Sequence, residues 1–198
     1  MKILKYAIFF ILFIFLITGC GDKEQPKQQS PQQTQTETKP VSNIKFFKMT
    51  GFEKSTSKNT PPEFNWEEEG KKISITDFKG KVVFINFWAT WCGPCKAEMP
   101  SLSKINEELK DKNFVMLGIN LPEGSKIKAE DYLNTNPVSY TIIDANGQFF
   151  QAFADAAGAS SEAIPTSFII NKEGKIAETI VGARDHETFK KIINKYLD

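Results

Sequence analysis

Apolar residues fall along the chain in short dense runs, and these runs alternate with stretches of helical periodicity. The runs are rich in β-branched and aromatic residues, which is typical of strands covered on both faces. They are residues 81–88, 114–119 and 139–144. Helical periodicity is clear in 93–110 and weaker in 126–135. Strands that alternate with helices in this way predict right-handed β-α-β units around a parallel sheet.

The C-terminal part has a different pattern. Residues 165–170 and 175–181 are strand-like and flank the turn sequence NKEG, so they predict an antiparallel hairpin. An amphipathic stripe at the end of the chain predicts a helix, with Asp185 as its N-cap. The stripe consists of Phe189, Ile192, Ile193, Tyr196 and Leu197. The predicted fold is therefore α/β, with a mixed sheet that is parallel in the centre, an antiparallel C-terminal hairpin, and helices on both faces.

The first nineteen residues carry a targeting pattern. Lys2 and Lys5 precede an apolar run of twelve residues that ends at Ile17. This run is shorter than the about 20 residues that span a bilayer, so it predicts a signal peptide over 1–19. An uncleaved membrane anchor is the alternative. The sequence ITGC after the run resembles the lipobox of bacterial lipoproteins, and this resemblance implies that Cys20 is lipidated and becomes the new N-terminus.

The chain after Cys20 begins with a polar segment. Residues 21–40 contain no aliphatic or aromatic side chain, so burial cannot offset the entropy of ordering them. We expect the lipidated Cys20 and a flexible tether to occupy 20–60, although IKFFKM at 44–49 could add an edge strand. The compact domain is expected over 61–198, a length that supports a single core.

The charge of the chain is balanced. Without residues 1–19, which hold two lysines and no acid, it has 23 basic and 24 acidic residues. Such a balance provides no electrostatic surface for nucleic acid. We therefore expect no nucleic-acid partner.

Two further cysteines, Cys92 and Cys95, are spaced as CxxC where a strand is predicted to end and a helix to begin. Three interpretations compete with redox chemistry. A closed zinc site needs four ligands, and the domain offers only these thiols and His186. A structural disulfide across so short a loop constrains the unfolded chain little. Two inert buried thiols are the third alternative, but a strand-to-helix junction tends to expose its side chains.

Redox chemistry fits the surroundings of the pair better. A thiol at a helix N-terminus faces the positive end of the helix dipole, which stabilises the thiolate that attacks disulfides. Cys95 lies within reach of Cys92 and can resolve a mixed disulfide. Pro94 fits the first turn of a helix, where its missing N–H costs little, and Gly93 lets a partner chain approach closely. The spacing therefore suits a disulfide that opens and closes without refolding.

The stretch FWATWCGPCKAEMP, residues 87–100, resembles the active site of thioredoxin-fold proteins of the extracytoplasmic TlpA/ResA type. PPEF before it, and IPTSFIINKEGKI and VG after it, stand in the order of that family. The resemblance runs from about Pro61 to the C-terminus. It implies a thioredoxin-like three-layer sandwich and the activity of a thiol-disulfide oxidoreductase.

The resemblance also implies roles for single residues. Cys92 would be the nucleophile and Cys95 the resolving thiol. Pro165 would be a cis-proline beside the CxxC, with the backbone of Ile164 pairing with a substrate strand. Glu98 would tune the cysteines, the alternative being a solvated helix glutamate.

Other positions complete this expected site. Trp91 should be exposed beside Cys92, whereas Trp88 should be packed. Asn86 stands where cytosolic thioredoxins carry a buried Asp, and Pro100 matches a proline that kinks the active-site helix. The expected substrate-binding residues are Trp91, Gly93, Pro94, Ile164 and Pro165. The segment ADAAGASSEA, 154–163, is longer than is usual in the family, and we expect it to be flexible and to reshape the substrate groove.

These observations predict an oxidoreductase that is lipid-anchored to the bacterial membrane and faces the extracytoplasmic side of the cell envelope. The Gly-Pro dipeptide resembles that of reducing thioredoxins, which favours reduction of disulfides in exported proteins, among them apocytochrome c during cytochrome c maturation. A membrane electron donor would recharge the pair. We expect a monomer that uses no cofactor and no metal.

Two other classes of function remain. A peroxiredoxin-like peroxidase would carry Thr where this chain has Ala89. A non-enzymatic lipoprotein that binds peptides through a thioredoxin fold would normally lose one cysteine of the pair, and both are present.

Overall fold

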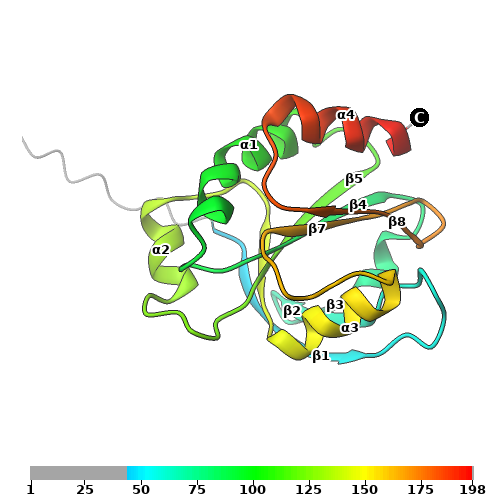
Figure 1. The fold of residues 1–198 in the computed structure, drawn as a ribbon, viewed down its shortest axis with the longest axis horizontal. Coiled ribbons are helices and arrows are strands. Elements are labelled where there is room, and N and C mark those ends of the chain that lie inside the picture. The colour runs from blue at the N-terminus through cyan, green and yellow to red at the C-terminus, as the bar shows by residue number, and fades with distance from the viewer. Residues whose placement is uncertain (1–43, 198) are drawn as a thin grey trace, which may run out of the picture. The chain divides into compact units, whose positions relative to one another are not determined.

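One eight-stranded mixed sheet organises residues 44–197, the part of the chain that the computed structural model describes (Figure 1). The strands follow the order β3-β2-β1-β6-β5-β4-β7-β8 across the sheet. They are β1 (Phe46–Glu53), β2 (Glu63–Glu68), β3 (Lys71–Ser74), β4 (Val82–Trp88), β5 (Phe114–Asn120), β6 (Thr141–Asp144), β7 (Thr166–Ile170) and β8 (Ile176–Val181). The helices are α1 (Gly93–Leu109), α2 (Ala129–Thr135), α3 (Gly147–Ala157) and α4 (His186–Leu197), with a 3-10 turn at Ile75–Phe78.

The centre of the sheet is parallel and its C-terminal edge is antiparallel. β4 pairs in parallel with β5, and β5 with β6. β7 then pairs antiparallel with β4 and with β8, which confirms the predicted hairpin. Every residue of β4 is buried, because helices cover both of its faces. The predicted mixed sheet is thus confirmed.

Helices lie on both faces of the sheet and produce three layers (Figure 1). α1 and α4 pack together on one face, where Trp88, Leu102 and Phe189 belong to one buried cluster. α3 lies on the opposite face, where Phe149 and Phe168 belong to a second cluster. This arrangement confirms the thioredoxin-like fold class.

The ordered sheet begins earlier than the predicted domain boundary at Pro61. β1 lies within the range assigned to the tether, and it pairs with β2 on one side and with β6 on the other. It is therefore an interior strand and not an edge strand. Its apolar side chains pack on both faces, Phe46 against the first cluster and Phe47 against the second. The signal at 1–19, Cys20 and the tether to residue 43 lie outside the described residues.

Helix α3 was not predicted, and it corrects the expectation for 154–163. Residues 154–157 form the last turn of α3, which ends at Gly158 with a φ of 66°. Three phenylalanines, Phe149, Phe150 and Phe153, bury one side of this helix in the second cluster. Only 158–163 connects α3 to the loop before β7. Residues 154–157 of this segment are therefore helical, and residues 158–163 form the connection.

The remaining predicted elements differ only at their ends. α2 begins at Ala129 and not at residue 126 as predicted, and residues 121–128 form a loop before it. Asp185 caps α4 as predicted, accepting a 2.7 Å hydrogen bond from the Thr188 N–H. Among residues 44–197, no helix combines the length and apolar character that crossing a membrane requires.

Candidate active site

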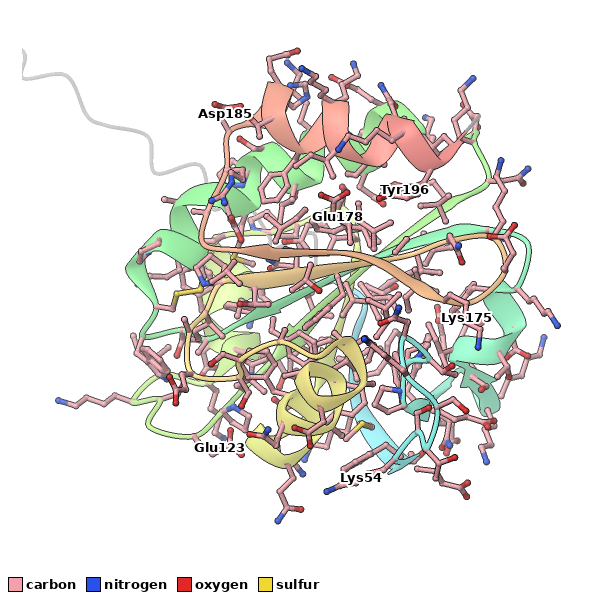
Figure 2. The ribbon with its side chains drawn as sticks, turned by 45° about the vertical axis from the view of Figure 1, so that its right-hand side comes forward. Lys54, Glu123, Lys175, Glu178, Asp185 and Tyr196 are labelled. Carbon is pink, nitrogen blue, oxygen red and sulfur yellow. A yellow bond between two sulfur atoms is a disulfide. The ribbon has the colours of Figure 1, made fainter. Side chains whose placement is uncertain are left out.

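Cys92 and Cys95 lie at the junction of β4 and α1. The buried strand β4 ends at Trp88, and after four intervening residues the helix starts at Gly93 with Pro94 in its first turn. Cys92 is the N-cap residue, and its Sγ accepts a hydrogen bond of 3.2 Å from the backbone N–H of Cys95. A disulfide joins the two residues, and it appears as the yellow bond at the start of α1 in Figure 2.

This position stabilises negative charge on the first sulfur. The N–H groups of the first helical turn and the helix dipole both favour thiolate over thiol at an N-cap. No acidic residue occupies the first turn of α1. Cys92 is 4% exposed and Cys95 is fully buried, so Cys92 is less accessible than the sequence suggested, although it remains the more accessible residue of the pair.

The loop before β7 lies against the first sulfur. The Ile164–Pro165 peptide bond is cis, as predicted. The Sγ of Cys92 lies 3.6 Å from the carbonyl oxygen of Ile164, across 72 residues of sequence. The Pro165 carbonyl in turn accepts a hydrogen bond of 2.8 Å from the Gly182 N–H, which fixes this loop to the end of β8. The fold thus brings the predicted loop and the CxxC together.

The expected substrate-binding residues border the sulfur pair. Trp91 is 57% exposed, and Gly93 and Pro94 are also exposed. Trp88 is fully buried, as predicted. The indole Nε1 of Trp91 donates a 2.9 Å hydrogen bond to the carbonyl oxygen of Glu123. The outer side of the CxxC therefore presents an aromatic ring in a fixed orientation.

Glu98 is a buried carboxylate one turn after Cys95, and not a solvated helix residue. Its side chain is 3% exposed. Burial raises its pKa to about 7, because desolvation disfavours the ionised form, while a hydrogen bond from Asn86 and the nearby Arg184 act in the opposite direction. Its second oxygen, Oε2, is buried without a hydrogen-bond partner of good geometry. A group with these properties can take up and release a proton near neutral pH.

Asn86 connects Glu98 to β7. Its side-chain Nδ2 donates to Glu98 Oε1 at 2.8 Å and to Ser167 Oγ at 3.0 Å. All three side chains are buried. Asn86 and Ser167 are also paired in the register of β4 and β7. The position occupied by Asp in cytosolic thioredoxins thus carries a neutral donor here, and the carboxylate is supplied by the helix.

The sequence did not identify Ser167 or Glu123 as part of the site. Ser167 is a small polar residue in the buried strand β7, and the hairpin register places it opposite Asn86, so a register argument would have found it. Glu123 carries no signal, because its contact with Trp91 is made by a backbone carbonyl. Within residues 44–197, no group of three or more His, Cys, Asp and Glu side chains is placed to hold a metal ion.

Comparison with known proteins places this geometry in context. Residues 56–196 match the Redoxin family. The chain is 33% identical to the thiol-disulfide oxidoreductase ResA of Bacillus subtilis over 134 residues, which is 67% of this chain and 71% of that protein. It is 34% identical to ResA of Bacillus anthracis over 127 residues, which is 64% of this chain and 70% of that protein.

Solved structures give the same result. A thiol:disulfide interchange protein of the thioredoxin family from Chlorobium tepidum superposes with a TM-score of 0.62 at 29% identity, covering 73% of this chain and 99% of that one. StoA from Bacillus subtilis superposes with a TM-score of 0.52 at 28% identity, covering 62% and 89%.

Proposed function

The chain belongs to the Redoxin family as a thiol-disulfide oxidoreductase of the ResA type, and from this premise we propose that it reduces disulfides of exported proteins outside the cytoplasm. Cys92 is the attacking thiol and Cys95 the resolving thiol in this proposal. The observation that carries it is the placement of Cys92 at the N-cap of α1, with its sulfur accepting the Cys95 N–H and lying beside the Ile164 carbonyl.

The exchange proceeds in two balanced steps. The Cys92 thiolate attacks one sulfur of the client disulfide, forms a new S–S bond with it, and releases the other client sulfur as a thiolate that takes a proton. Cys95 then loses its proton and attacks the Sγ of Cys92, which releases the second client thiolate and leaves the Cys92–Cys95 disulfide. The second client thiolate also takes a proton. Counted from the reduced protein with both thiols protonated, the client gains two electrons and two protons, and the protein loses them, one proton when Cys92 ionises and one from Cys95.

Glu98 is suited to the second step as the general base for Cys95. It lies one helical turn beyond Cys95, it is buried, and its pKa of about 7 leaves a substantial ionised fraction at neutral pH. A carboxylate with an ordinary pKa would be a weaker base. Asn86 orients the carboxylate through Oε1, which leaves Oε2 for proton transfer.

The client chain is proposed to lie between Trp91 and the loop at Ile164 and Pro165. Exposed Gly93 and Pro94 leave space above the sulfur pair, and a backbone carbonyl and N–H at Ile164 are suited to pairing with an extended segment. The connection 158–163 borders the same loop and is proposed to shape this groove.

The location and the source of electrons form the finer part of the proposal. The targeting pattern at 1–19 and the ITGC sequence support export and lipidation at Cys20, with the tether holding the domain at the membrane. The oxidised pair must be reduced again, and a membrane electron donor is the class of partner that reaches this compartment. Apocytochrome c is the proposed client in cytochrome c maturation.

The reduction potential of the purified protein tests the direction of the reaction. The Gly-Pro dipeptide between the cysteines is that of reducing thioredoxins, so we expect a value near −270 mV after equilibration with defined thiol buffers. A value near −120 mV, typical of strong oxidants, would contradict reduction of clients. Peroxide consumption measured in parallel separates this activity from that of a peroxidase.

A further inference from the structure

The loop 121–128 is fastened by three hydrogen bonds to the segment 88–91, which precedes the CxxC. The backbone N–H of Leu121 donates to the Trp88 carbonyl at 2.9 Å. The hydroxyl of Thr90 donates to the Ile127 carbonyl at 2.8 Å. The indole of Trp91 donates to the Glu123 carbonyl at 2.9 Å. This loop is therefore fastened near both of its ends and at Glu123 to the segment that immediately precedes the CxxC.

Glu123 makes a second contact that leads away from the CxxC. Its carboxylate Oε1 accepts a 2.9 Å hydrogen bond from the backbone N–H of Gly147, the first residue of α3. Figure 2 shows Glu123 beside the start of this helix. A carboxylate at a helix N-terminus satisfies an unpaired N–H and is favoured by the helix dipole. One residue thus holds the Trp91 ring through its backbone and α3 through its side chain.

The proposed client groove has Trp91 on one side and the loop at Ile164 on the other, and α3 connects these two sides. α3 runs from Gly147 to Ala157, and its connection 158–163 leads directly to Ile164, whose carbonyl lies beside the Cys92 sulfur. Trp91 is thus connected through Glu123, α3 and residues 158–163 to Ile164, which lies on the other side of the Cys92 sulfur.

The Trp91 side of the groove is apolar and exposed. Ile127 is 55% exposed, and its carbonyl is held by Thr90, the residue before Trp91. Two large exposed apolar side chains on one side of a reactive sulfur suit a partner that presents an apolar side chain.

We propose that Glu123 is a positioning residue for client recognition, which holds Trp91 and the loop 121–128 in place to receive an apolar side chain next to the client's half-cystine. The inference rests on the proposed reduction of protein disulfides. It assigns to Glu123 no contact with the reacting atoms.

The test compares four single variants, and the double variant Glu123→Ala/Trp91→Phe, with the wild type. Glu123→Ala removes the contact to Gly147, and Glu123→Gln retains an oxygen that accepts it. Trp91→Phe removes the indole N–H together with its five-membered ring and keeps an aromatic side chain. Glu130→Ala is the matched control, because Glu130 is an exposed acid on the neighbouring helix α2. The substrates are a peptide disulfide with Leu beside the half-cystine, the same peptide with Ser there, and a small organic disulfide.

We expect Glu123→Ala to raise KM for the Leu peptide by about three- to tenfold, the range expected for losing one hydrogen bond of ordinary strength at an exposed position. The Ser peptide and the small disulfide should change less. Glu123→Gln should restore KM to within about twofold of the wild type. Trp91→Phe should act like Glu123→Ala, and the double variant should be no worse than either single variant.

Fluorescence quenching by acrylamide provides a readout that does not depend on activity. Trp91 is exposed whereas Trp66 and Trp88 are buried, so quenching reports on Trp91. We expect Glu123→Ala to increase quenching and Glu130→Ala to leave it unchanged. Equal behaviour of these two variants, or an equal loss on all three disulfides, would overturn the inference. If the wild type reduces no peptide, the proposed function fails, and quenching still decides the role of Glu123.

Discussion

Asn86 on β4 donates a 2.8 Å hydrogen bond to the carboxylate of Glu98 on α1, and both side chains are buried. The amide offers Glu98 a donor without a charge, so it offsets only part of the desolvation of the carboxylate. Burial remains the larger effect and the pKa of Glu98 rises to about 7. The redox site therefore contains a group that changes charge in the range where thiol exchange operates.

The raised pKa of Glu98 should appear in the stability of the oxidised protein. The pKa of about 7 in the folded state exceeds the value of 4.5 expected when the chain is unfolded, so the folded state holds the proton more tightly. The contribution of Glu98 to stability is therefore fully present below pH 4.5 and is lost as the pH rises through 7. The loss should be about 3 kcal/mol of unfolding free energy.

Denaturant unfolding at pH 5 and pH 8 measures this loss. Glu98→Gln should lose less stability between the two values than the wild type, since it carries no titrating group at this position. Glu130→Gln, an exposed acid on α2, serves as the control and should follow the wild type. Parallel curves for the wild type and Glu98→Gln would show that the carboxylate titrates normally.

Cys95→Ser should trap clients. The variant keeps Cys92 at the N-cap, so the first exchange step still occurs, but no thiol remains to resolve the mixed disulfide. Adducts with exported proteins should appear on non-reducing gels and disappear on reduction. Cys92→Ser should show few adducts, because the remaining sulfur is fully buried. If Cys92→Ser trapped clients and Cys95→Ser did not, the roles of the two cysteines would be reversed.

Cys20→Ala should change the location of the protein. If the cysteine of ITGC carries lipid, its loss should release the protein from membrane fractions or block processing of the signal. Metabolic labelling with a fatty-acid analogue, with the wild type as reference, measures the modification directly. Absence of label from the wild type would leave an ordinary signal peptide or an uncleaved anchor.

The sequence predicted the elements whose patterns are strong and local. β4 is a dense apolar run, α4 has a complete amphipathic stripe, and the flanking Trp and Gly-Pro of the CxxC indicate a redox pair. α3 was missed because the small residues of its C-terminal part suggested a flexible loop, although Phe149, Phe150 and Phe153 are spaced to lie on one side of a helix. Its burial against β7 and β4 depends on contacts far apart in the chain.

The site shows the same division between local and distant relationships. Cys92 and Cys95 are three positions apart in the sequence, so their proximity can be predicted locally. The hydrogen bond from Asn86 to Ser167 joins positions 81 residues apart. The role of Glu123 depends on a backbone carbonyl, which any residue at that position would possess. Side-chain identity alone therefore could not reveal it.

Gly118→Ala should destabilise the sheet beside the site. Gly118 pairs with Asn86 in the register of β4 and β5, and a Cβ there would lie 2.5 Å from Cδ1 of Ile142 and 2.9 Å from Cε2 of Tyr140. Both neighbours are buried and cannot move freely, so we expect a loss of about 1–3 kcal/mol in urea unfolding. Gly51→Ala is the matched control, since a Cβ there meets no atom within 4 Å. Equal losses of stability in the two variants would show that the neighbours of Gly118 can move to accommodate the added Cβ.

Glu98→Gln should also shift the titration of the thiols in the reduced protein. Glu98 becomes ionised as the pH rises through about 7, and its negative charge then opposes formation of a thiolate one helical turn away. Removing the charge should move the appearance of thiolate to lower pH by about one unit. The groups titrate as a coupled set, so the measured midpoints belong to the set and not to one residue.

Ultraviolet absorbance of the thiolate as a function of pH gives these midpoints, and client reduction measured over the same range gives their consequence. Glu98→Gln retains the size of the side chain and an oxygen that accepts from Asn86, so a change reflects the charge and not a lost contact. We expect faster first attack below pH 8, because more Cys92 is thiolate, and slower release of the mixed disulfide, because the base for Cys95 is gone. Superimposable titration curves would mean that the Glu98 carboxylate does not act on the sulfur pair, and the proposed proton transfer would then have to be assigned to another group.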